Sequence, residues 1–129
     1  MENKFNESTP QRPEGSRPID APIVLISLKG FEEQIKGESS WKDSDRNAIT
    51  VFKSDFMRIV MVALHKGAIF NPHSEKGMIS IQVLDGSLKF STDKEKVKLA
   101  KGELLVLHET VSHSAEALEE STFLLTLSR

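Results

Sequence analysis

Residues 67–86 read GAIFNPHSEKGMISIQVLDG. His73 and Glu75 stand two positions apart, and side chains at i and i+2 of an extended strand point to the same face. An imidazole and a carboxylate aimed at one point can hold a divalent metal or orient a polar substrate. The alternating apolar segment that follows ends at Asp85-Gly86. Asp-Gly predicts a hairpin turn, because both central residues of a type I′ turn need a positive φ.

This stretch resembles the first conserved motif of the cupin superfamily. That motif has a glycine, five residues, His-x-His, a glutamate three or four residues on, and a closing glycine. Three positions match, namely Gly67, His73 and Gly86. Glu75 stands in place of the second histidine, and the glutamate position falls on Ile79 or, with the longer spacing, on Ser80.

Residues 102–117 resemble the second cupin motif. That motif is a glycine, five residues, Pro-x-Gly, two residues, a histidine and, four further on, an asparagine. Gly102 and His113 match. His108 stands at the proline position, Thr110 at the glycine and Ala117 at the asparagine. The resemblance as a whole covers residues 56–129.

The resemblance implies an all-β fold, namely a double-stranded β-helix or jelly-roll barrel. It places His73 and His113 inside that barrel, facing each other across antiparallel strands. With Glu75 they would form a two-histidine, one-carboxylate set, which iron, zinc, nickel or manganese accepts. The family's fourth protein ligand has no counterpart, since Ile79 offers no donor atom and Ser80 a poor one.

Two functions are consistent with these motifs. The first is a small-molecule-binding cupin whose ligand is held by His73, His113, Met61 and Phe90, with at most one weakly held divalent metal. The second is a metal-dependent cupin enzyme, an oxygenase or isomerase. Whether the protein is an enzyme stays open, as does general acid–base work by either histidine, because imidazole titrates near neutrality.

Composition excludes several other classes of function. The 129 residues predict one domain. With 17 basic and 19 acidic residues, charge gives no reason to expect a nucleic-acid or anionic-membrane partner. The absence of cysteine excludes disulfides and thiolate chemistry. Residues 1–20 lack the apolar core of a signal peptide, and no segment approaches the ~20 apolar residues of a membrane span, so we expect a cytoplasmic protein by default.

The N-terminal third predicts a tail followed by the start of the barrel. Residues 1–20 hold three prolines among polar residues and predict a mobile, disordered tail rather than a docking arm, with the barrel domain spanning residues 21–129. Residues 21–28 (APIVLISL) predict a first strand, whose exposed edge would pair with a second copy in a homodimer. The spacing of Phe31 and Ile35 predicts one short helix ending at Gly37. Trp41 is expected to cap the core, with a dimer contact as the alternative.

Further short β-rich runs, separated by turn signals, are typical of an antiparallel barrel or sandwich. They are residues 47–53, 56–65, the segment up to Leu84, 88–91, 97–100, 104–107, 114–118 and 122–127. The side chains expected to point inward are Met61, Ile81, Val83, Phe90, Leu104, Val106, Phe123 and Leu125. Among them Met61 and Phe90 are expected to line an apolar pocket for a small ligand.

The two remaining histidines predict no catalytic site. His65 precedes an expected turn, which favours a structural or solvated role. His108 and His113 enclose HETVSH, which has one residue more than the His-Glu-x-x-His motif of zinc proteases. At i,i+5 two helical side chains diverge by about 140°. A metalloprotease is therefore rejected.

Overall fold

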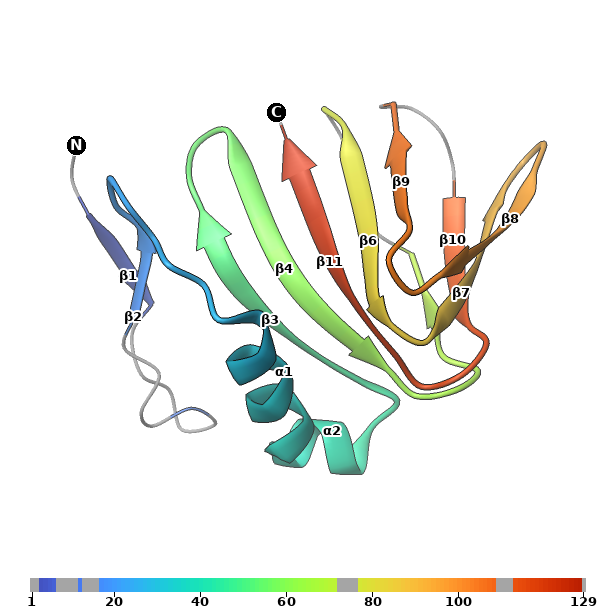
Figure 1. Cartoon of the computed structure of the whole chain (residues 1–129), viewed down its shortest axis with the longest axis horizontal. Helices are drawn as coiled ribbons and strands as arrows, with labels where there is room; N and C mark the ends of the chain where they lie inside the picture. The colour runs from blue at the N-terminus through green and yellow to red at the C-terminus, as the bar shows by residue number, and fades with distance from the viewer. Residues whose placement is uncertain (1–2, 7–11, 13–16, 72–76, 109–112, 129) are drawn as a thin grey trace.

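The computed structural model describes residues 3–6, 12, 17–71, 77–108 and 113–128. Two antiparallel sheets form its body, a four-stranded one in the order β5-β10-β7-β8 and a five-stranded one in the order β3-β4-β11-β6-β9 (Figure 1). The elements are β1 (Lys4–Asn6), β2 (Arg17–Asp20), α1 (Leu28–Gly37), α2 (Ser39–Asp43), β3 (Arg46–Lys53), β4 (Met57–Leu64), β5 (Ile69–Phe70), β6 (Ile79–Asp85), β7 (Ser87–Thr92), β8 (Lys96–Ala100), β9 (Leu104–Leu107), β10 (His113–Ala117) and β11 (Ser121–Ser128). The predicted all-β jelly roll is confirmed.

The two sheets pack face to face around an interior cluster. Its buried members are Val60, Val62, Leu64, Ala68, Ile79, Ile81, Val83, Leu88, Phe90, Leu99, Ala115, Ala117, Phe123 and Leu125. Five of the predicted inward residues are therefore confirmed, and two are wrong. Leu104 and Val106 are 59% and 55% exposed, whereas Leu105 and Leu107 pack against the interior cluster. The run Leu104–Leu107 is apolar throughout, so its pattern could not show which residues face inward.

The opposite face of the five-stranded sheet carries a second, outer cluster beneath the helices. It consists of Ile35, Trp41, Ile49, Val51, Met61 and Ala63. Met61 is buried here and not between the sheets, so the expectation that it shares the interior with Phe90 is wrong. Both faces of β4 are covered, which is why its sequence is apolar at nearly every position.

The predicted N-terminal helix is present, and a second helix follows it. Helix α1 begins at Leu28, where the Oγ of Ser27 accepts a hydrogen bond from the Gly30 amide at 3.2 Å, and it ends at Gly37 as expected. The five-residue α2 carries Trp41, whose burial confirms the core-capping interpretation. Among the described residues, no helix has the length and apolar character needed to cross a bilayer.

Residues 21–27 contain no strand, which corrects the prediction of a first strand over residues 21–28. Ile23 and Leu25 are 86% and 95% exposed. A β-branched, apolar run favours extended backbone, but a strand needs a neighbour to satisfy its amides and carbonyls. No described strand lies beside this segment in either sheet.

The Asp85-Gly86 turn does not close a hairpin. Gly86 has the predicted positive φ of 85°, but β6 pairs with β9 and β11 whereas β7 pairs with β8 and β10. The turn therefore carries the chain from one sheet to the other. The hairpin of this region lies one turn later, where β7 pairs with β8 and the amide of Thr92 donates to the carbonyl of Glu95 at 2.8 Å.

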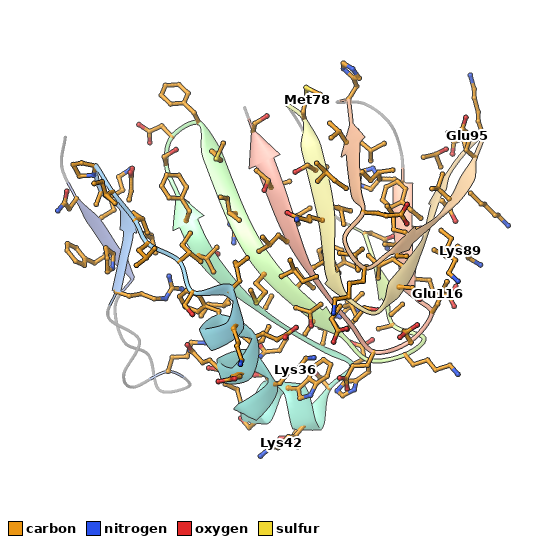
Figure 2. The ribbon with its side chains drawn as sticks, viewed as in Figure 1. Lys36, Lys42, Met78, Lys89, Glu95 and Glu116 are labelled. Atoms are coloured by element: carbon orange, nitrogen blue, oxygen red, sulfur yellow. The ribbon has the colours of Figure 1, made fainter. Side chains whose placement is uncertain are left out.

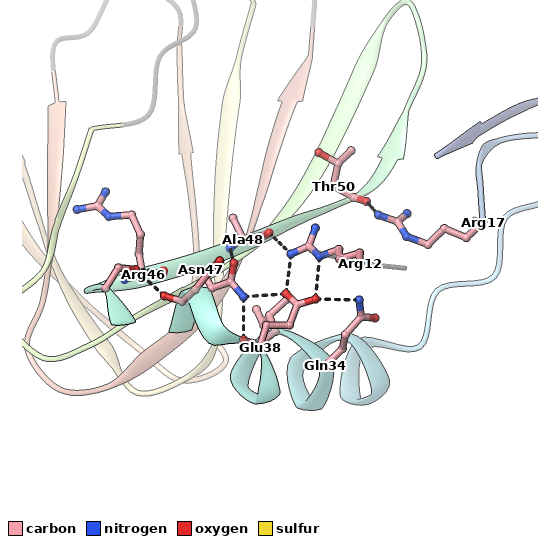
Figure 3. A network of polar contacts seen from close by, with 11 residues as sticks. Arg12, Arg17, Gln34, Glu38, Arg46, Asn47, Ala48 and Thr50 are labelled. Carbon is pink, nitrogen blue, oxygen red and sulfur yellow. Dashed lines mark hydrogen bonds and ion pairs between the residues drawn. The ribbon is translucent and has the colours of Figure 1, made fainter. Parts of the chain in front are cut away.

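The described part of residues 1–20 contacts the body of the molecule, in contrast to the mobile tail predicted there. Strands β1 and β2 pair with each other, and two arginines reach the outer edge of β3 (Figure 3). Arg12 Nη2 donates to the carbonyl of Ala48 at 2.7 Å, and Arg17 Nη2 donates to that of Thr50. The prediction considered only the few apolar residues and not these charged donors. The division of the chain into two parts at residue 20 stays a prediction.

Candidate functional site

His113, the first residue of β10, points toward the interior. It lies opposite Thr92 of β7, and Ala115, two positions on, lies opposite Phe90. Ala115 and Phe90 both belong to the interior cluster. Because side chains two apart in a strand share a face, the imidazole of His113 projects from the inner face of the four-stranded sheet. This is the orientation that the second motif implied.

The His113 ring stacks on Phe90. The two ring centroids are 5.4 Å apart and the ring planes are inclined by 21°. Phe90 is fully buried and His113 is half-buried. The phenyl ring thus packs against the imidazole at the interior cluster. This brings together two of the predicted ligand-binding residues.

Apolar side chains fill the position at which the resemblance would place a metal-binding glutamate. Ile79 is buried in the interior cluster, and Ser80 faces the opposite side of the same strand. Ile79 lies opposite Leu107 of β9, which packs against the same cluster. With neither spacing does a carboxylate enter the interior from β6. At these positions the strands β6 and β9 therefore present hydrocarbon to the interior.

The other two predicted metal ligands, His73 and Glu75, lie outside the described residues. Among the residues that the structure does describe, no three His, Asp or Glu side chains come close enough together to hold a metal ion. The described residues supply one interior imidazole, that of His113. The three-residue ligand set of His73, Glu75 and His113 stays a prediction.

The other two histidines that the structure describes, His65 and His108, have different surroundings. His65 follows β4 and stacks on Trp41, with ring centroids 3.5 Å apart, and its Nε2 is 2.8 Å from the Trp41 carbonyl oxygen. These contacts support the structural role predicted for His65. His108 follows β9 and is exposed. Met61 lies in the outer cluster, so the structure does not bring it together with His113 or Phe90.

Phe70 is an interior residue that the sequence reasoning did not single out. Its ring meets that of Phe123 edge to face, with centroids 5.6 Å apart, and it packs against the interior cluster. Phe70 stands two positions after Ala68, which is buried in that cluster. The same period-2 rule that oriented His73 and Glu75 could have identified it.

No protein-family model matches the chain, and no curated protein matches it. Several solved structures do match the chain. Salicylate 1,2-dioxygenase from Pseudoaminobacter salicylatoxidans, solved as adducts with gentisate, matches with a TM-score of 0.71, 18% identity and 85% of this chain. A cupin-2 domain containing protein from Shewanella frigidimarina matches with a TM-score of 0.65, 15% identity, 82% of this chain and 96% of its own. The chain has the cupin fold.

A third similar structure is more alike in sequence. KdgF from Halomonas sp. is 26% identical over 67% of this chain and 83% of its own chain, with a TM-score of 0.59. This chain spans only 34% of the length of salicylate 1,2-dioxygenase. At such identities the likeness establishes the fold, and the chemistry must be argued from residues of this chain.

Proposed function

We propose that this cupin binds a small organic acid between its two sheets, with His113 as the polar contact. The observation that carries the proposal is the interior-facing imidazole of His113 stacked on Phe90. A binding pocket of a small barrel is mostly apolar with a few convergent polar groups that orient the ligand. His113 supplies such a group, and Phe90 and the interior cluster to which it belongs supply the apolar surface.

The imidazole suits an acidic ligand for two reasons. In its neutral form it donates one hydrogen bond and accepts another, and in its protonated form it donates two and carries a positive charge. A charge-assisted hydrogen bond to a carboxylate is about twice as strong as a neutral one. The stacking of the ring on Phe90 favours the observed orientation, which lowers the side-chain entropy lost when a ligand binds.

A metal-dependent enzyme is the second candidate. It would use His73, Glu75 and His113 to hold one divalent ion, and the fold it shares with a dioxygenase favours it. Buried Ile79 at the glutamate position argues against a four-ligand site. Two histidines and one carboxylate form a donor set that several divalent metals accept, and a metal held there would act as a Lewis acid or bind oxygen.

The probe for ligand binding is gentisate, an aromatic hydroxy acid. We expect gentisate to release or absorb heat on titration into the full chain, and His113→Ala to abolish that signal. His108→Ala removes an exposed histidine from the same region of sequence and serves as the matched control, so its titration should equal that of the wild type. A signal unchanged by His113→Ala, or no signal from the wild type, would contradict the proposal.

Elemental analysis separates the two candidates. The protein is purified without chelator, and its iron, zinc, nickel and manganese contents are compared with those of His113→Ala. For a small-molecule-binding cupin we expect well below one metal per chain. One metal per chain that is lost in His113→Ala would favour the enzyme. A stoichiometric metal retained by His113→Ala would contradict both assignments of His113.

A further inference from the structure

A cavity far along the chain from His113 lies between β2 and the strands β3 and β4. Its volume is about 380 Å³, which is within the range of small-molecule sites. Apolar side chains form one part of its wall, namely Ile19, Ala48 and Val60. Three cations form another part, namely Arg12, Lys53 and Arg58, and no acidic residue is among the described residues that line it.

Two of these cations face each other directly across the sheet. Lys53 of β3 is the register partner of Arg58 of β4. Like charges placed opposite each other on neighbouring strands are destabilising. Arg58 Nη2 donates to Thr50 Oγ1 at 3.1 Å, which directs its guanidinium along the cavity wall. Asp55, in the turn between these strands, is 3.4 Å from Lys4 and so is engaged elsewhere.

The four-stranded sheet contains a comparable pair of like charges on neighbouring strands. Lys89 of β7 is the register partner of Lys98 of β8, but Lys89 Nζ is 3.6 Å from Glu116 Oε1 on the other side (Figure 2). There a carboxylate compensates the repulsion. Among the described residues, no carboxylate plays this part for Lys53 and Arg58.

A fourth cation adds to the excess of positive charge. Arg17 projects from β2 beside Arg12 (Figure 3), and its buried Nη1 has no hydrogen-bond partner among the described residues. Burial and the charge of Arg12 both lower the pKa of Arg17. Arg12 forms an ion pair with Glu38 at 2.8 Å. Among the described residues, the carboxylate of Glu38 pairs with Arg12, and no carboxylate forms an ion pair with Arg17.

We propose that this cavity binds a small organic anion, whose carboxylate or phosphate group lies between Arg58 and Lys53 and whose body lies against Ile19 and Val60. Guanidinium and ammonium groups are the side chains that recognise carboxylate and phosphate. An anionic group there replaces the missing carboxylate of the Lys53–Arg58 pair. The site is separate from the interior site at His113 and does not depend on the proposed function.

The test measures the affinity of the full chain for citrate and for inorganic phosphate by calorimetry at constant ionic strength. We expect the wild type to bind at least one of the two anions and Arg58→Gln to weaken that binding about tenfold or more, since a hydrogen bond to a charged group is lost. Lys53→Gln should weaken it likewise and serves as the second variant. Tighter binding of citrate would indicate that the cavity recognises a carboxylate. Tighter binding of inorganic phosphate would indicate that it recognises a phosphate group.

Lys98→Gln is the matched control, because it removes one charge from the compensated cross-strand pair. It should leave the affinity unchanged. The proposal is overturned if neither anion binds, or if Lys98→Gln weakens binding as much as Arg58→Gln does, because attraction to overall charge would then suffice. Loss of citrate binding in His113→Ala alone would assign the anion to the interior site instead.

Discussion

Ser121 lies directly against Gly86. A Cβ atom at residue 86 would be 2.3 Å from Ser121 Oγ and 2.4 Å from the carbonyl oxygen of Glu120. Ser121 Oγ accepts a hydrogen bond from the Ser87 amide at 3.0 Å and approaches the carbonyl oxygens of Ser87 and Glu119 at 3.0 and 2.8 Å. The serine hydroxyl thus satisfies backbone groups where the chain leaves one sheet for the other, and only a glycine lets it come so near.

Gly86→Ala should therefore destabilise the protein by about 3 kcal/mol. A positive φ costs about 1–2 kcal/mol for a residue with a Cβ, and overpacking adds about 1–3 kcal/mol. Urea unfolding measures the change. Gly67 has a similar φ of 87° but no atom within 4 Å of its Cβ position, so Gly67→Ala should cost only the backbone part. Equal losses for the two variants would contradict the role of the contact with Ser121.

Thr122→Val should stabilise the protein by about 1 kcal/mol. Thr122 is fully buried, and its Oγ1 has no hydrogen-bond partner among the described residues. A buried hydroxyl without a partner costs about 1–3 kcal/mol, and valine has nearly the same shape. The measurement is again urea unfolding. Thr126→Val, on the same strand but half-buried, is the control and should change stability by less than about 0.5 kcal/mol.

Acid should weaken the attachment of the N-terminal segment through Glu38. The pKa of Glu38 lies below its ordinary value of 4.5, chiefly because Arg12 donates hydrogen bonds to its carboxylate at 2.8 and 2.9 Å. A carboxyl group whose pKa is lower in the folded state stabilises that state above its ordinary pKa, and this contribution disappears as pH falls through the lowered pKa.

We therefore expect the wild type to be more stable than Glu38→Gln at pH 7, and the difference to shrink once the pH falls below about 4.5. Thermal unfolding at a series of pH values measures it. Glu33→Gln, at an exposed position of α1, serves as the control and should leave the pH profile unchanged. A constant difference between wild type and Glu38→Gln down to pH 2 would rule out the ion pair with Arg12 as its cause.

Self-association is expected through residues 21–27. Ile23 and Leu25 present apolar side chains to solvent on an unpaired, non-helical segment, and pairing with a strand of a second copy would bury them. Light scattering at micromolar concentration should report a dimer for the wild type and a monomer for a variant carrying Ile23→Asn and Leu25→Asn. A monomeric wild type would contradict the prediction of a homodimer.

Most of the sheet structure could be predicted from the sequence. Strands such as β6 alternate buried and exposed residues, because one of their faces meets the interior and the other does not. The glycines of the two motifs, Gly67, Gly86 and Gly102, all have the positive φ that explains their presence. Local signals of this kind depend on the conformation of a few neighbouring residues. The folded chain keeps that local conformation, so the signals predict it.

What could not be predicted depended on partners distant in the sequence. Asp85-Gly86 is a turn by its local chemistry, but whether its two flanking strands pair is determined by the remaining strands. Met61 is apolar whichever side it faces, and only the position of α1 reveals that it faces the helices. For the candidate site, the orientation of His113 followed from the motif. The cationic cavity joins residues 12 and 19 to residues 53 and 58, and no motif predicts it.

The guanidiniums of Arg12 and Arg17 occupy the carbonyls of Ala48 and Thr50 on the free side of β3. A version of the protein shortened by its first 17 residues would display those carbonyls as a ready template for another polypeptide. Growth of such contacts from molecule to molecule leads to fibrils or precipitates. Residues 1–17 would then protect the molecule from aggregation, and their removal would be detected as turbidity.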